Sequence, residues 1–212
     1  MYKMARGEAT LNVITCLSTF EAWRIQMQLE DKQKKELLRI ARSSIHSVLG
    51  GISDAPELAA SVELEEPRGV FVTLRSKGEL RGCIGYVEPR LPLARAAQEV
   101  AAKAATEDPR FLPLSLMEFE NTQIEISVLS PLTRVNDPQT IEVGKHGLVI
   151  DAGYARGLLL PGVPLEYHWT REEFLDHTAT KAGLSPDIWR TGKVNIFSFT
   201  TETFSESMQQ VQ

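Results

Sequence analysis

Hydrophobic and polar positions along the chain predict helices separated by short strands from residue 27 onward. In residues 27–51, apolar side chains recur at helical spacing, charged side chains lie between them, and two glycines follow. This pattern predicts one amphipathic helix that packs on the core. Residues 91–111 carry a second stripe, rich in alanine, which predicts a helix lying close against a sheet and ending at Asp108 and Pro109.

Other segments have the character of strands. Residues 67–87 predict two short strands joined by a turn at 76–78. Further strands are predicted at 122–132, at 141–150 (a hairpin that turns at 144–147), at 155–164 and, as one last strand, at 194–204. In 122–132, isoleucine and valine alternate with polar residues, so one face of that strand is expected to be buried.

The order of these elements predicts the fold class. Thr170 and Glu173 form a capping box at the start of another helix, which ends near Gly183. Hairpins mixed with isolated helices favour an α+β fold, with a largely antiparallel sheet flanked by helices. Residues 27–212 are expected to form one domain. Residues 1–26 have no clean period and are expected to be an N-terminal extension.

Composition narrows the classes of function. The chain has 212 residues, 42% of them hydrophobic, and a net charge of −5, which argues against a dedicated nucleic-acid binder. Two cysteines make no disulfide framework, so a cytoplasmic location is expected. No apolar run approaches the roughly 18 residues of a membrane span, and the N-terminal segment lacks the features of a signal peptide.

The stretch GELRGCIGYVEP, residues 78–89, is the first candidate for chemistry, because glycines weaken a strand that only has to pack. Alternation along a strand places Arg81, Cys83 and Gly85 on one face. A nearby guanidinium would lower the pKa of the thiol, and Gly85 would leave room for a ligand. A free cysteine is also often a small buried hydrophobe, so both interpretations stay open.

A nucleophilic cysteine needs a base, and His146, in a glycine-flanked turn, is the better histidine candidate. A solvated turn residue is an equal alternative for it. Glu107, Asp108 and Arg110 form either a polar cluster at a cleft or, as favoured here, a solvated helix end. The histidine and cysteine spacings match no zinc motif, so no metal site is predicted.

Six motifs, taken in order, resemble the AMMECR-one domain family, also called AmmeMemoRadiSam system protein A. They cover nearly everything from residue 27 onward, and residues 1–26 lie outside the resemblance. The motifs are LRGCIG at 80–85, DPRF at 108–111, EISVLSPL at 125–132, GKHGLVI at 144–150, GLLLP at 157–161 and FLDHTATKAGL at 174–184.

The resemblance implies an α+β fold with a larger and a smaller lobe and the LRGCIG region near the cleft between them. It also implies a pathway shared with a MEMO-like protein and a radical S-adenosylmethionine protein, but no settled activity and no known cofactor. The family positions of interest are Arg81, Gly82, Cys83, Gly85, Arg110, Glu125, Lys145 and His146. The chain departs from the family at Ala179, where a cysteine is usual, and at Gly162, where a glutamine is usual.

Two functions follow as hypotheses. In the first, the protein is an enzyme or enzyme component: Cys83 is the nucleophile or covalent carrier, Arg81 stabilises a thiolate or substrate anion, and His146 is the acid or base. Gly82, Gly85, Arg110, Glu125 and Lys145 then bind a small molecule. In the second, the protein is a non-catalytic accessory that presents its cleft to a partner. Nucleic-acid binding or modification is a weaker third alternative.

Overall fold

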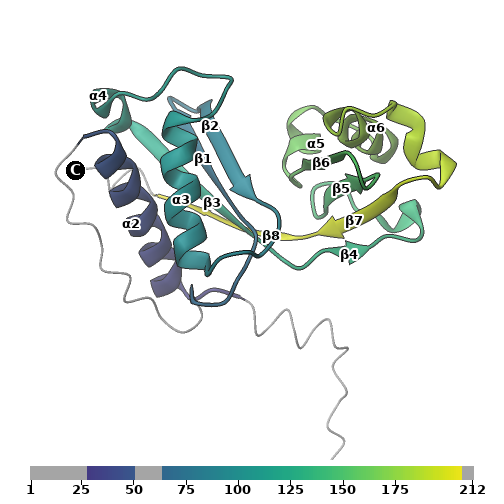
Figure 1. Ribbon diagram of the computed structural model, residues 1–212, viewed down its shortest axis with the longest axis horizontal. Coiled ribbons are helices and arrows are strands. Elements are labelled where there is room, and N and C mark those ends of the chain that lie inside the picture. Colours follow the sequence, from purple (N-terminus) through teal and green to yellow (C-terminus); the bar gives the residue numbers. More distant parts are fainter. Residues whose placement is uncertain (1–27, 51–63, 207–212) are drawn as a thin grey trace, which may run out of the picture.

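The computed structural model describes residues 28–50 and 64–206, which form two antiparallel four-stranded sheets, each with its own helices (Figure 1). This arrangement confirms the α+β class. The extension predicted at residues 1–26 lies outside the described residues. No helix within the two described ranges is long and apolar enough to cross a membrane.

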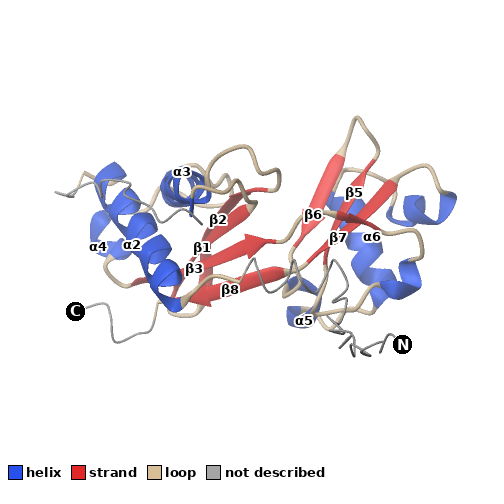
Figure 2. Cartoon of the chain, turned by 90° about the horizontal axis from the view of Figure 1, so that it is seen from below, coloured by secondary structure: helices blue, strands red, loops and turns tan. Residues whose placement is uncertain are grey.

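The first sheet has the strand order β2-β1-β3-β8 and is covered by helices α2 and α3 (Figure 2). Val70, Val72 and Leu74 of its second strand are fully buried beneath these helices, as the alternation along a strand requires. The elements are α2 (Asp31–Val48), β1 (Val70–Ser76), β2 (Glu79–Tyr86), α3 (Leu93–Thr106), α4 (Leu116–Phe119), β3 (Thr122–Leu129) and β8 (Thr201–Ser205).

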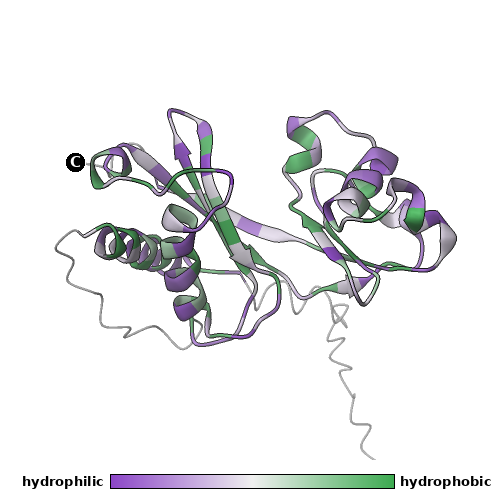
Figure 3. Ribbon diagram, turned by 45° about the horizontal axis from the view of Figure 1, so that its top comes forward, coloured by the Kyte–Doolittle hydropathy of each residue, from purple (hydrophilic) through white to green (hydrophobic). Residues whose placement is uncertain are grey.

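The second sheet has the order β4-β7-β5-β6 and packs against helix α6, which begins at the predicted capping box of Thr170 and Glu173. Phe174 and Leu175 of that helix are fully buried in a separate hydrophobic cluster. The elements are β4 (Thr133–Arg134), η2 (Pro138–Thr140), β5 (Gly147–Asp151), β6 (Arg156–Leu159), α5 (Val163–Glu166), α6 (Arg171–Lys181), η3 (Pro186–Thr191) and β7 (Asn195–Phe199). Figure 3 shows hydrophobic positions along the central strands of both sheets.

Two strand predictions are wrong. Residues 141–146 do not form the first arm of a hairpin; they turn into β5, which instead makes a hairpin with β6. The segment 194–204 is not one strand, because it leaves one sheet at Phe199 and enters the other at Thr201. The apolar pattern of this segment serves two different cores, so it gives no sign of the break.

The chain crosses between the sheets twice, and the two crossings are bonded to each other. The N–H of Ser130 donates to the carbonyl of Thr200 at 2.9 Å, and the N–H of Thr200 donates to Ser130 Oγ at 2.9 Å. A third hydrophobic cluster, built around Leu129, Val149 and Phe199, packs residues of both sheets together. These hydrogen bonds and this packing join the two sheets beside the space between them.

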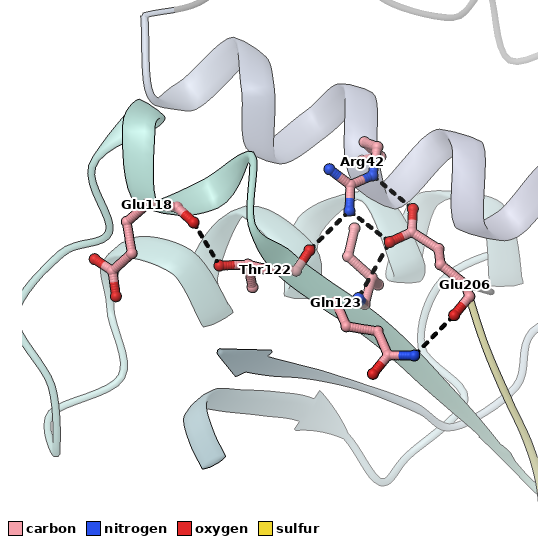
Figure 4. A network of polar contacts seen from close by, with 6 residues as sticks. Arg42, Glu118, Thr122, Gln123 and Glu206 are labelled. Carbon is pink, nitrogen blue, oxygen red and sulfur yellow. Dashed lines mark hydrogen bonds and ion pairs between the residues drawn. The ribbon is translucent and has the colours of Figure 1, made fainter. Parts of the chain in front are cut away.

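A polar network ties the last strand to helix α2 (Figure 4). Arg42 Nε donates to the buried carboxylate of Glu206 at 2.6 Å, and its terminal nitrogen donates to the carbonyl of Thr122 at 2.9 Å. Gln123 Nε2 donates to the carbonyl of Glu206 at 2.8 Å. Together these bonds hold the end of β8 against β3 and α2.

Candidate functional site

The LRGCIG strand contains a β-bulge at Arg81, which changes the predicted faces. Leu74 of β1 pairs with Gly82, but Arg75 pairs with Leu80, so Arg81 is the extra residue. Leu80, not Arg81, therefore shares the face of Cys83. The guanidinium of Arg81 turns to the carboxylate of Glu118, to which it donates at 2.6 Å and 3.2 Å. The expected pairing of Arg81 with the thiol is wrong.

The glycines of this strand make room for other parts of the protein. A Cβ on Gly82 would lie 2.3 Å from the carbonyl oxygen of Ala104 in helix α3. A Cβ on Gly85 would lie 2.3 Å from the ring of Phe71. The space that the sequence suggested for a ligand is thus filled by a helix backbone on one face and by an aromatic ring on the other.

The surroundings of Cys83 favour its neutral thiol over the thiolate. Burial raises the pKa of its thiol, while a hydrogen bond from the Thr73 hydroxyl at 3.3 Å and the charge of Arg110 oppose that rise only in part. The thiolate is the nucleophilic form of cysteine, so this environment disfavours the nucleophile that the sequence suggested. The thiol still faces a pocket and is open to contact with a ligand.

Asp108 connects the DPRF segment to this strand. Its carboxylate accepts the backbone N–H of Cys83 at 2.8 Å and the guanidinium of Arg110 at 3.0 Å and 2.7 Å. The bonds from Arg110, followed by the backbone bonds, lower the pKa of Asp108 to about 2. The Asp108 side chain is only 3% exposed, so the favoured interpretation of this segment as a solvated helix end is wrong for Asp108, whereas Glu107 and Arg110 are exposed.

A pocket of about 550 Å³ lies between the two sheets, a size suited to a small molecule. Strands β2 and β3 of the first sheet contribute Cys83 and Glu125, the turn after α3 contributes Arg110, and α5 beside the second sheet contributes Glu166. Hydroxyl groups also line the pocket, from Thr73, Ser127, Thr201 and Thr203. The strand register explains this set, because Cys83, Thr73 and Glu125 lie side by side across three neighbouring strands.

The charged groups of this pocket are paired, with one exception. Arg75 pairs with Glu166 at 3.4 Å, and Arg110 pairs with Asp108. The side chain of Glu125 is half-buried and makes no hydrogen bond or ion pair with any other residue that the structure describes. A carboxylate held in a pocket without a partner is the site's unused acceptor, and a ligand with an N–H donor would satisfy it.

Lys145 and His146 are not among the residues that line the Cys83 pocket. His146 Nδ1 accepts the backbone N–H of Glu142 at 3.1 Å, so its ring closes its own turn. Burial, together with the charge of Lys145, lowers the pKa of His146. The lining of the Cys83 pocket, as far as the described residues define it, includes neither Arg81 nor His146. Within the same residues, no group of three His, Cys, Asp or Glu side chains is arranged to hold a metal ion.

The two departures from the family pattern have different surroundings. Gly162 lines the Cys83 pocket, and no atom lies within 4 Å of the position that its Cβ would take. Ala179 is fully buried in the core of the second sheet. Of these two positions, only Gly162 lies in the wall of the pocket, where a larger residue would add a side chain.

Comparison with known proteins identifies the family. A family model named AMMECR1 matches residues 38–204. A protein from Methanocaldococcus jannaschii is 44% identical over 181 residues, covering 80% of this chain and 88% of its own. The crystal structure of the uncharacterized protein PH0010 from Pyrococcus horikoshii is similar at a TM-score of 0.80 and 40% identity, covering 84% of this chain and 94% of that one. The chain belongs to the AMMECR1 family.

Proposed function

We propose that this protein binds a small molecule carrying an amine in the pocket between its two sheets, with Glu125 as the group that accepts it. The unpaired carboxylate of Glu125 is the observation that carries this proposal. Its neighbours Thr73 and Cys83 offer a hydroxyl and a neutral thiol, which add polar contacts without competing for the positive charge.

The balance of charge in the pocket supports a cationic group. The pocket is lined by two guanidinium groups, those of Arg75 and Arg110, and by the carboxylates of Glu125 and Glu166. A third carboxylate, that of Asp108, is bonded to Arg110. Both arginines already face a carboxylate, which leaves one negative charge uncompensated. An ammonium group would neutralise this charge and form a charge-assisted hydrogen bond.

The same geometry favours a binding role over covalent catalysis by Cys83. The pKa of the Cys83 thiol is raised, the ring of His146 is bonded within its own turn, and the guanidinium of Arg81 is bonded to Glu118. Activation of a cysteine normally requires such partners within hydrogen-bonding distance of the thiol. Of the two hypotheses, we therefore favour the second, a non-catalytic accessory protein that presents its cleft to a partner.

Calorimetric titration with small primary amines, amino acids and carboxylic acids tests this function. We expect amines and amino acids to bind and simple carboxylic acids not to bind. Glu125→Gln removes the charge but keeps the shape, so it should weaken amine binding about tenfold, the effect of losing about 1.4 kcal/mol from a charged hydrogen bond. Glu120→Gln is the matched control, because Glu120 is exposed and lies outside the pocket. Equal binding by both variants would contradict the proposal.

The resemblance adds a setting for this role. We propose that the bound molecule is held for a MEMO-like protein or a radical S-adenosylmethionine protein of the same pathway. Affinity purification from the native cell should then recover such a partner, and pocket variants should recover less of it. Recovery of the protein repeatedly without either partner would contradict this setting and leave the binding of an amine to be judged by titration.

A further inference from the structure

The wall that the first sheet gives to the Cys83 pocket is mainly polar. Thr73, Cys83 and Glu125 lie side by side across three strands, and Ser127 lies beside Thr203 in the next row. The Thr73 hydroxyl donates to Cys83 Sγ at 3.3 Å, and the hydroxyls of Ser127 and Thr203 are bonded to each other at 2.9 Å. Glu125 is the charged group on this wall whose side chain has no partner among the described residues.

The wall on the side of the second sheet is mainly apolar. It is formed by residues 160–163, the Leu-Pro-Gly-Val segment that runs from the end of β6 into α5. Leucine, proline, glycine and valine carry no hydrogen-bonding group in their side chains. Helix α5 faces the first sheet, because its Glu166 pairs with Arg75 of β1 at 3.4 Å. A ligand in this pocket therefore meets polar groups on one side and hydrocarbon on the other.

The backbone of this apolar wall is also largely engaged. The carbonyl of Leu160 accepts the N–H of Val163 at 3.2 Å, and the carbonyl of Gly162 accepts the N–H of Leu165 at 3.1 Å. Pro161 has no N–H to donate. A ligand hydroxyl pressed against this wall would lose its bound water without gaining a protein partner, which is unfavourable. The wall therefore disfavours a ligand that is polar on all sides.

We propose that the ligand is an amine with an apolar body, whose ammonium group lies at Glu125 and whose hydrocarbon part lies against residues 160–163. A pocket of about 550 Å³ has room for a ring or a branched chain beside the ammonium group. The class includes branched and cyclic alkylamines and excludes amino sugars and other polyhydroxylated amines. The inference rests on the proposed function for the amine, and it adds the chemistry of the rest of the ligand.

Calorimetric titration of the full chain with methylamine, isobutylamine, cyclohexylamine and glucosamine tests the proposal, at a pH where all these amines are protonated. We expect affinity to rise from methylamine through isobutylamine to cyclohexylamine by about tenfold or more, which burial of only about two methylene groups would supply. Glucosamine carries its amine on a ring of the same size but has hydroxyls around it. It should bind about tenfold more weakly than cyclohexylamine, because its hydroxyls meet the apolar wall.

Val163→Thr replaces one methyl group of the apolar wall with a hydroxyl, so it should weaken cyclohexylamine binding about fivefold more than methylamine binding. Val48→Thr is the matched control, since Val48 is exposed and lies outside the pocket. The inference is overturned if methylamine or glucosamine binds as tightly as cyclohexylamine, or if the two variants bind cyclohexylamine equally. The proposed function still stands in those cases if Glu125→Gln weakens the binding of amines. Absence of binding by every amine overturns both.

Discussion

The buried carboxylate of Asp108 accepts the backbone N–H of Cys83 at 2.8 Å and so fastens the DPRF segment to the LRGCIG strand. The same carboxylate holds the guanidinium of Arg110 at the edge of the pocket. Two motifs separated by a whole helix thus act as one structural unit beside Cys83.

Asp108→Asn should reduce the free energy of unfolding at pH 7 by about 2.5 kcal/mol. The pKa of Asp108 falls to about 2 in the folded protein, against about 3.9 in the unfolded chain. Because the folded pKa is depressed, this stability is present above the unfolded value and is lost as pH falls through the folded one. Urea unfolding at pH 7 and at pH 3 should therefore show the variant's deficit shrinking in acid. A deficit equal at both pH values would contradict this account of Asp108.

Gly82→Ala should destabilise the protein by about 1–3 kcal/mol, as overpacking of a tight contact does. The added Cβ would meet the carbonyl oxygen of Ala104 at 2.3 Å, so helix α3 must move away from β2. Gly162→Ala is the control, because its Cβ would meet nothing within 4 Å. Thermal unfolding of both variants measures the difference, and equal melting temperatures would show that the helix does not approach the strand so closely.

The thiol of Cys83 should react with iodoacetamide at pH 7 roughly tenfold more slowly than a free cysteine, because its raised pKa leaves little thiolate. Cys16 is first replaced by serine. Arg81→Met should leave the rate unchanged, since that guanidinium is bonded to Glu118, whereas Arg110→Met should slow it further. A fast reaction that Arg81→Met abolishes would restore Cys83 as a nucleophile.

Glu206→Gln should cost about 2 kcal/mol of stability, because it leaves the charge of Arg42 without its buried partner. Glu36→Gln is the control on the same helix: its ion pair with Arg39 is partly exposed and should contribute under about 0.5 kcal/mol. Urea unfolding of the two variants gives the comparison. Equal losses would mean that the ion pair between Arg42 and Glu206 stabilises the fold no more than the pair between Glu36 and Arg39 does.

Elements whose pattern depends only on neighbouring residues could be predicted from the sequence. The stripe in α2, the capping box at Thr170 and the alternation in β3 each depend on neighbouring residues, and the structure has all three. The break at Thr200 depends on which core each half of the segment meets, and apolar residues serve both cores. Which sheet each half of this segment joins depends on the fold of the whole chain, so the local spacing of apolar residues does not predict it.

The site was harder to predict for the same reason. The bulge that moves Arg81 away from Cys83 accompanies the close approach of α3 at Gly82, and simple alternation contains neither. Asp108 follows a helix and precedes a proline, which is the usual pattern of an exposed helix end. Its burial depends on the N–H of Cys83 lying beside it. The family resemblance named Glu125, but only the pocket reveals that it has no partner among the described residues.

The most direct test of the central claim is to look for a small molecule that stays bound when the protein is purified. Wild type, Cys83→Ser and Glu125→Gln would be purified in parallel from the native cell, and released compounds would be identified by mass spectrometry. The account predicts an amine-bearing compound bound without a covalent link, retained by Cys83→Ser and lost from Glu125→Gln. A compound attached to Cys83, kept by Glu125→Gln and lost from Cys83→Ser, would contradict it.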